Sequence, residues 1–315
     1  MMNYETFKQR VLDTFIDYLP VSYRNKILSV QSIEKVNRVV EGLSFSSKDT
    51  NVSAVIYIND MYQEYLESGD LKKTLADAAE RLVEGDCTSR RILPLVQPLN
   101  EEEIKSRIFF RLINAERNKP LLKKVPHRDY LDLSVIYQVM VSEADGSKEI
   151  GSYILTNEMY KKLSGIDLYE TALANSRRAM PAIISSVKDV FMSFMDRTYP
   201  DNTAAMPELD EEFLCSNMWV ITNQMGVNGA AAILYADLKE LSEKQDADLC
   251  LLPSSIHEWI AVADDGDPRT LLVLENMVRE INKEIVSLSD RLSDRVYRYC
   301  RKTGKIEIAS KMQTL

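Results

Sequence analysis

The first residues of the chain carry apolar side chains at the spacing of an amphipathic helix. Phe7, Val11, Phe15 and Leu19 recur at every fourth position and are followed by Pro20. Side chains four residues apart share one helix face, and proline ends a helix. The pattern predicts a helix up to Pro20 whose apolar face packs on another part of the protein.

The pattern then changes to the period of β-strands. Apolar and polar residues alternate from Val52 to Ile58, and residues 27–36 and 39–45 are two further runs of strand-forming residues. We therefore expect three strands in this part of the chain, followed by helices through about residue 83.

The middle of the chain predicts a β-hairpin and a long helix. Residues 131–141 and 150–155 have the composition of strands, and Asp145 and Gly146 between them suit the positive φ angles of a tight turn. The stretch from residue 168 to residue 195 is predicted to be helical and to pack behind this hairpin.

The last third predicts alternating strands and helices, which is typical of layered α/β or α+β structures. We expect strands at residues 218–222, 230–235, 248–252, 257–262, 296–299 and 305–308, and helices at 237–244 and 271–285.

Two stretches with prolines and polar residues divide the chain, at residues 87–98 and 198–212. They suggest three modules, at residues 1–88, 89–200 and 201–315, of which the last two are able to pack as one domain. The fold class expected is mixed α/β of the α+β type, with repeated strand–helix modules, antiparallel hairpins and helices that cover the sheets.

Two segments resemble each other and indicate an internal repeat. The segments that contain Asn59 and Asn157 both continue through an acidic residue, Met-Tyr, a Ser-Gly break and a second helix. The two asparagines are 157 − 59 = 98 positions apart. Either a duplicated strand-to-helix unit or a chance likeness of two junctions explains this. In both cases the asparagines suit helix N-caps.

Composition excludes several classes of protein. The net charge of −9 repels nucleic acid and anionic membranes in bulk, and Lys188 and Asp189 interrupt the most apolar stretch, so we expect no membrane span. The N-terminus lacks the apolar core of a signal peptide, which favours the cytoplasm. Neither phosphate-binding glycine motif occurs and the cysteines form no C-x-x-C pair, so we expect no cofactor and no metal.

The segment from Pro253 to Glu258 is the strongest candidate for catalysis. It combines two hydroxyls, an imidazole and a carboxylate directly after an apolar strand: Ser254, Ser255, His257 and Glu258. A serine–histidine pair or an acid–base pair would suit a hydrolase. However, neighbouring residues of a strand point to opposite faces, and neither G-x-S-x-G nor H-E-x-x-H is present. A structural turn is therefore the favoured interpretation.

Weaker candidates have simpler explanations. His127, the other histidine, lies in a basic loop without a partner nearby in the sequence. The three aspartates from Asp264 to Asp267 suit a turn better than a calcium loop. Glu103 and Lys105 resemble an E-x-K nuclease element, although their Glu-rich surroundings favour a helix start.

Basic residues form two clusters. One spans residues 117–128, and the other includes Arg295, Arg298 and Arg301, which alternate with tyrosines as in strands that stack nucleic-acid bases. Nucleic-acid binding is thus possible at this strand, although an ordinary edge strand has the same pattern.

Four segments resemble an uncharacterised family of gut Gram-positive bacteria, a domain of unknown function. They are residues 55–62, 167–175, 252–258 and 292–297, of which L-P-S-S-I-H-E is the most specific. The resemblance implies a bacterial origin and no activity. We therefore favour a non-catalytic binding or regulatory protein with an unknown protein partner. The alternatives are a hydrolase that uses Pro253 to Glu258 and a nucleic-acid-associated protein.

Overall fold

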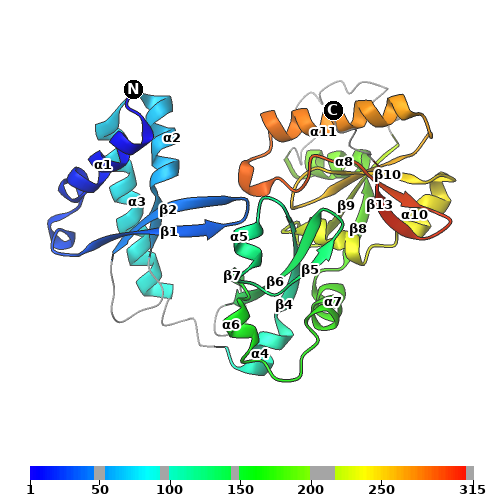
Figure 1. Ribbon diagram of the computed structural model, residues 1–315, viewed down its shortest axis with the longest axis horizontal. Helices are drawn as coiled ribbons and strands as arrows, with labels where there is room; N and C mark the ends of the chain where they lie inside the picture. The colour runs from blue at the N-terminus through cyan, green and yellow to red at the C-terminus, as the bar shows by residue number, and fades with distance from the viewer. Residues whose placement is uncertain (46–53, 93–98, 143–148, 199–216, 310–315) are drawn as a thin grey trace. The chain divides into compact units, whose positions relative to one another are not determined.

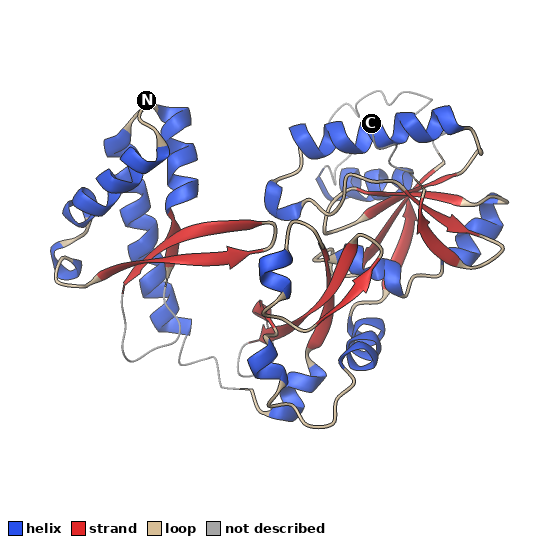
Figure 2. Cartoon of the chain, in the orientation of Figure 1, coloured by secondary structure: helices blue, strands red, loops and turns tan. Residues whose placement is uncertain are grey.

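The computed structural model describes residues 1–45, 54–92, 99–142, 149–198 and 217–309, and these residues form helices and antiparallel sheets (Figures 1 and 2). This confirms the α+β class. The chain divides into two compact units. Unit 1 contains Met1–Leu99 and Val141–Gly151, and unit 2 contains Asn100–Met140 and Ser152–Leu315. The three-module division stays a prediction, and its first border falls inside a helix that ends at Ile92.

Unit 1 begins with the predicted amphipathic helix. Helix α1 spans Tyr4–Thr14, and the Asn3 side chain caps it by accepting a hydrogen bond from the Thr6 N–H. The chain then tightens into the short 3₁₀ helices η1 (Phe15–Tyr18) and η2 (Val21–Tyr23) instead of continuing as α-helix to Pro20. The predicted apolar face is buried all the same, since Phe7, Val11, Phe15 and Leu19 all lie in the core.

A three-stranded sheet carries the rest of unit 1. Its order is β1-β2-β3, and the tight β1–β2 connection places Asn37 at a φ of 65°. Helices α2 and α3 pack with α1 around Leu43 and Phe45 of the sheet. The elements are β1 (Leu28–Lys35), β2 (Arg38–Phe45), β3 (Val55–Tyr57), α2 (Ile58–Ser68) and α3 (Leu71–Ile92).

A four-stranded sheet with the central strand β6 belongs mostly to unit 2, although the end of β6 and the start of β7 are counted in unit 1. Strand β4 pairs with one side of β6, and β5 and β7 pair with successive parts of its other side. Helix α7 packs on β4, where Tyr169 contacts Phe110. The elements are α4 (Glu101–Ser106), β4 (Ile108–Asn114), α5 (Lys119–Leu122), β5 (His127–Tyr130), β6 (Leu133–Ser142), β7 (Glu149–Ile154), α6 (Asn157–Tyr160) and α7 (Leu168–Ala179).

Unit 2 also contains a six-stranded antiparallel sheet in the order β13-β12-β10-β11-β9-β8. Helices α8 and α11 cover one face (Figure 2), and α10 packs on the other face beside Trp219. The elements are β8 (Ala182–Ser186), α8 (Val187–Thr198), β9 (Met218–Asn223), η4 (Gly229–Leu234), α10 (Leu238–Gln245), β10 (Leu249–Pro253), β11 (Trp259–Ala263), α11 (Pro268–Glu284), η5 (Leu288–Asp290), β12 (Tyr297–Cys300) and β13 (Lys305–Ile308).

Two predicted elements are wrong. The helix expected from residue 168 to residue 195 is interrupted by β8, because Pro181 ends α7 and the β-branched Ile183 and Ile184 follow it. The strand expected at residues 230–235 is the 3₁₀ helix η4, whose small residues pack closely against the loop that contains His257. Strand β11 begins at Trp259, so His257 precedes it in that loop.

The similar segments around Asn59 and Asn157 share one turn but differ in their helices. Neither asparagine is an N-cap, so that prediction is wrong: Tyr57 occupies the N-cap position of α2 without a side-chain hydrogen bond, and the Thr156 side chain caps α6. Both segments do reach a glycine in the left-handed conformation, Gly69 and Gly165, before the next helix. The duplication itself stays a prediction.

Candidate functional site

The serines, histidine and glutamate of the predicted catalytic segment lie in the loop that joins β10 to β11. The Ser255 hydroxyl accepts a hydrogen bond from the His257 N–H at 3.0 Å, and the Ser254 hydroxyl donates to the Glu258 carboxylate at 3.3 Å. Nδ1 of His257 accepts a hydrogen bond from the backbone N–H of Asn228 at 3.2 Å. The carbonyl oxygen of His257 also accepts from the Thr222 hydroxyl at 2.8 Å.

These bonds hold the loop in shape and do not form a nucleophile–base pair. Among the described residues, no hydrogen bond joins the imidazole of His257 to the hydroxyl of Ser254 or Ser255. A serine nucleophile needs such a bond for its activation. The polar groups of the loop are instead bonded to backbone groups and to each other, which is the pattern of a stabilised turn.

The three arginines proposed for nucleic-acid contact each lie near a carboxylate. Arg298 pairs with Asp264 at 2.5 Å and Arg301 pairs with Asp246 at 2.5 Å. The distance from Arg295 Nε to the Asp132 carboxylate is 3.6 Å. The tyrosines between these arginines are buried in the six-stranded sheet, so their rings are not available for stacking on bases.

The weaker candidates are also engaged in local structure. Asp264 accepts a hydrogen bond from the Gly266 N–H, and Asp267 caps α11. Glu103 forms a capping box with Asn100 at the start of α4. In the part of the chain that the structure describes, no group of three or more histidine, cysteine or acidic side chains is arranged to hold a metal ion.

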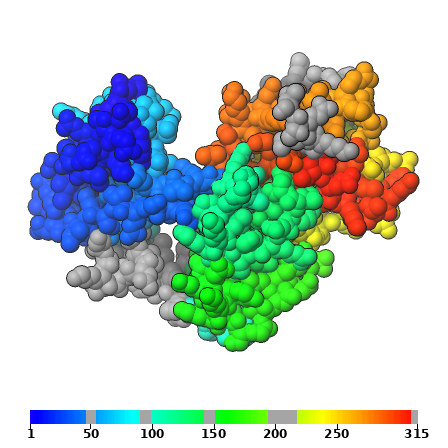
Figure 3. All heavy atoms as spheres, in the orientation of Figure 1, coloured from blue at the N-terminus to red at the C-terminus, as the bar shows by residue number. Residues whose placement is uncertain are grey.

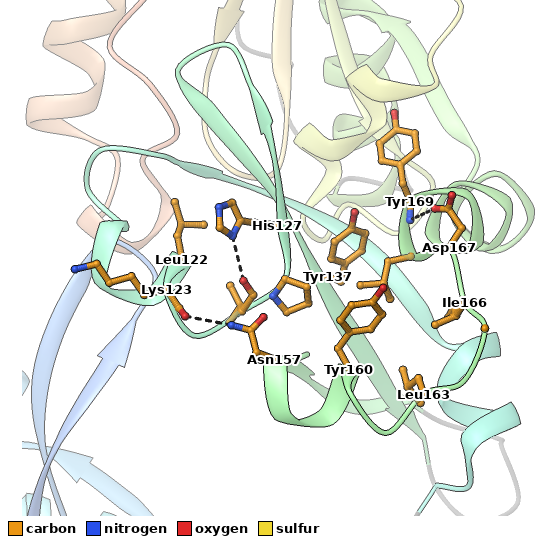
Figure 4. A pocket seen from close by; sticks show the side chains of 14 residues that line it. Leu122, Lys123, His127, Tyr137, Asn157, Tyr160, Leu163, Ile166, Asp167 and Tyr169 are labelled. Carbon is orange, nitrogen blue, oxygen red and sulfur yellow. Dashed lines mark hydrogen bonds between the residues drawn. The ribbon is translucent and has the colours of Figure 1, made fainter.

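A large cavity of unit 2 lies elsewhere, where β5 begins and β7 ends along β6. It has a volume of about 1140 Å³ and is open to solvent. Figure 4 shows the connection from α5 to β5 on one side and the connection from α6 to α7 on the other, with Tyr137 of β6 between them. Both connections belong to residues 99–142 and 149–198, which form part of the visible surface of unit 2 (Figure 3).

Aromatic and aliphatic side chains form the walls of this cavity. Tyr137 and Tyr160 lie beside each other in it, with Leu163 and Ile166 nearby, whereas the Tyr169 ring turns away (Figure 4). Burial raises the pKa of Tyr137 to about 12. Tyr137 therefore keeps its proton at neutral pH and is a neutral hydrogen-bond donor there, not a general base.

Two short hydrogen-bonded segments shape the rim. The Asn157 amide donates to the Lys123 carbonyl oxygen at 3.1 Å, which ties α6 to the end of α5. Nδ1 of His127 lies 3.1 Å from the Val125 carbonyl oxygen. Since a carbonyl only accepts, Nδ1 carries a proton in this bond and Nε2 remains available to a ligand.

Exposed lysines lie in the cavity lining and next to it in the chain. Lys123 lines the cavity, and Lys161 and Lys162 directly follow Tyr160; the side chains of all three are exposed, and none has an ion pair within the described residues. Asp167 is the acidic side chain of the cavity lining, and its carboxylate already accepts the N–H groups of the first turn of α7. Arg128 lies over the Tyr169 ring, with its guanidinium carbon 4.3 Å from the ring centroid.

Sequence reasoning missed this cavity. Its lining comes from three separated parts of the chain, and Tyr137 belongs to a strand whose mostly apolar sequence indicates only that it lies in the core. The one available signal was the basic cluster at residues 117–128, part of which lies on the rim.

Comparison with known proteins gives a family but no activity. A model described as "Family of unknown function (DUF5688)" matches residues 4–301. The chain belongs to this family. The DUF5688 match spans residues of both compact units, so both are part of what defines the family. No curated protein and no solved structure matches the chain. None of the helices in the described ranges is long and apolar enough to cross a membrane.

Proposed function

We propose that this protein is a non-catalytic binding protein that holds an acidic segment of a partner protein in the cavity around Tyr137 and Tyr160. The observation that carries the proposal is the combination of tyrosine walls with exposed lysines, Lys123 in the lining and Lys161 and Lys162 next to Tyr160 in the chain, that lack a carboxylate partner among the described residues. A protein with a net charge of −9 that leaves cations unpaired at one cavity favours a negatively charged ligand there.

The size and chemistry of the cavity favour a peptide over a small metabolite. Small-molecule sites usually occupy about 300–1,000 Å³ and enclose most of the ligand. The present cavity, at about 1140 Å³, is larger and open. Tyrosines are typical anchors of protein interfaces because they bury a large ring and keep a hydrogen-bonding hydroxyl.

The two other functions have less support. A hydrolase at Pro253 to Glu258 would need the imidazole of His257 free to act on a hydroxyl, whereas its Nδ1 accepts a backbone N–H. Nucleic-acid binding through Arg298 and Arg301 would have to displace Asp264 and Asp246. Both functions would gain support only from activity measurements.

The proposal also assigns the protein to the bacterial cytoplasm. The described cysteines, Cys87, Cys250 and Cys300, are all free thiols, and free thiols suit a reducing compartment.

A peptide titration tests the proposal. Two labelled peptides serve as probes, Ac-Glu-Asp-Phe-Glu-Asp-Leu-Glu-NH2 and the version in which lysine replaces every acidic residue. We expect the full chain to bind the acidic peptide at least tenfold more tightly by fluorescence anisotropy, because the rim attracts one and repels the other. Tyr160→Ser and Lys162→Glu should each weaken this binding.

The matched control is Lys302→Glu, which makes the same charge change at an exposed lysine in the turn between β12 and β13. Equal binding of both peptides, or equal losses in Lys162→Glu and Lys302→Glu, would contradict the proposal. Cleavage of either peptide that stops in Ser255→Ala or His257→Ala would favour the hydrolase instead.

A further inference from the structure

Arg111, in the middle of β4, is a mostly buried arginine without an ionic partner. Its Nε atom is sealed from solvent and makes no hydrogen bond. Within the described ranges, no hydrogen bond or ion pair reaches any nitrogen of this guanidinium. Arg117 also has a buried unbonded nitrogen, Nη1, but it pairs with Asp294 through Nη2, and Arg298 pairs with Asp264 through Nε itself.

Two neutral polar side chains lie near Arg111 on its face of the sheet. In the register of the sheet, Arg111 lies opposite Ile136 of β6. Ser134 and Gln138 flank Ile136 on the same face, at diagonal positions within reach of a long side chain. Both are buried, and the Ser134 hydroxyl has no hydrogen-bond partner.

The nearby carboxylates do not neutralise this arginine. Asp290 of η5 is the acidic group whose charge acts on Arg111, yet the two form no ion pair, and Asp290 accepts a hydrogen bond from the Ser287 hydroxyl at 2.8 Å. Asp129 lies opposite Ser134 in the register of β5 and β6, at the exposed edge. Burial outweighs the influence of Asp290 and lowers the pKa of Arg111.

A mostly buried charge without a partner is costly, and buried guanidinium groups are normally paired with an anion. We infer that Arg111 anchors a second ligand site, which takes an oxyanion group, a carboxylate or a phosphate, with the Ser134 hydroxyl as an additional donor. The planar guanidinium binds both groups through paired N–H bonds. Arg111 retains a small exposed fraction, so a ligand can reach it. Arg111 is not among the residues that line the tyrosine cavity, so this site does not depend on the proposed function.

NMR of the arginine side chains tests the site directly in the full chain. The Nε–H resonance of Arg111 is followed while inorganic phosphate, acetate or chloride is added. We expect a saturable shift with phosphate or acetate and none with chloride at the same ionic strength. The tighter of the two oxyanions identifies the ligand group as phosphate or carboxylate.

Three variants make the test specific. Arg111→Met removes the charge and keeps much of the volume, so we expect it to fold and to lose the binding. Ser134→Ala, at a fully buried position, should weaken binding about tenfold, which is typical of one hydrogen bond to a charged group. Arg279→Met is the matched control, because Arg279 is exposed on α11 beside Glu275.

Two results would overturn the inference. One is an Arg111 resonance that responds to no oxyanion, or to all three anions alike, which means that water or Asp290 satisfies the guanidinium. The other is unchanged binding in Arg111→Met. If the methionine variant does not fold, the wild-type resonance, assigned through Arg111→Lys, still decides the question.

Discussion

Unit 2 contains two polar surfaces that differ in how their hydrogen-bonding groups are used. In the loop from Ser254 to Glu258, hydroxyl, imidazole and carboxylate groups bond to one another and to the backbone. At the tyrosine cavity, the Lys123 ammonium group and Nε2 of His127 make no hydrogen bond or ion pair among the described residues, and the lysine is exposed. Groups already bonded stabilise the protein, whereas groups left unbonded are available to a ligand.

The comparison shows why a dense polar motif is a poor guide to a site on its own. The loop combines residue types that carry out catalysis in many enzymes. In this protein, however, these residues form the hydrogen bonds of a tight connection between two strands. The cavity has no motif, but it combines space, aromatic walls and unpaired charge. The variants below separate these two uses of polar groups, from the largest expected effect to the smallest.

Gly229→Ala should have the largest effect, because Gly229 lets η4 approach the loop. An added Cβ would meet the Thr222 hydroxyl and the His257 carbonyl oxygen well inside van der Waals contact. We expect a loss of about 3 kcal/mol in the free energy of unfolding, measured by urea denaturation. Gly226→Ala is the control: its φ of 67° is strained for alanine, but no atom lies within 4 Å, so a loss of only about 1 kcal/mol is expected. Equal losses of stability in the two variants would mean that the close packing of η4 against the loop does not stabilise it.

His257→Ala should cost about 1–2 kcal/mol of stability without a change in peptide binding. The variant leaves the buried N–H of Asn228 without its acceptor. Ser254→Ala should cost less, since it removes only a 3.3 Å bond between half-buried groups. Thermal and urea denaturation measure both. A variant that is as stable as the wild type but has lost an enzymatic activity would reverse the comparison and make the loop a catalytic site.

Much of the fold could be predicted from the sequence because burial sets the period of apolar residues. The helix that buries Phe7 and Val11, and the strands β1 and β2, follow directly from this pattern. Prediction failed at β8 (Ala182–Ser186), where the apolar residues Ala182, Ile183 and Ile184 are consecutive and show no period of two. It also failed at η4, because a run of alanines has no alternation of apolar and polar residues by which a strand could be distinguished from a 3₁₀ helix.

The candidate sites were harder to predict from the sequence than the fold, because they depend on long-range contacts. Whether His257 is free or bonded depends on Asn228, 29 positions away in the chain, and nothing in the local sequence indicates this contact. The same holds for Arg111, whose surroundings depend on the register of β4 against β6. Strand pairing is a long-range property, and a shift of one residue would place Arg111 on the opposite face relative to its neighbours.

Unit 1 contains a further cluster of hydrogen-bonded side chains, and its contribution to the stability of the protein should depend on pH. The Glu41 carboxylate accepts hydrogen bonds from Lys8 and from the Tyr4 hydroxyl, and these bonds lower the pKa of Glu41 from its ordinary value of 4.5. The stabilisation is therefore present above about pH 4.5 and is lost as the pH falls through the lowered pKa. Glu41→Gln should lower the free energy of unfolding by up to about 1 kcal/mol at pH 7, a small loss because the groups are partly exposed. In strong acid the substitution should not change the free energy of unfolding. Glu67→Gln, at an exposed carboxylate of α2, should show no such pH dependence in urea denaturation.

Lys123→Gln should have the smallest effect on stability and a clear effect on binding. Lys123 is exposed on the cavity rim and its ammonium group has no ion pair among the described residues, so we expect a change within about 0.5 kcal/mol in the free energy of unfolding. Binding of the acidic peptide should nevertheless weaken, because the rim loses one of its cations. A stability loss as large as that of His257→Ala would show that the lysine supports the fold. The rim and the loop would then use their polar groups in the same way, and the distinction between them would fail.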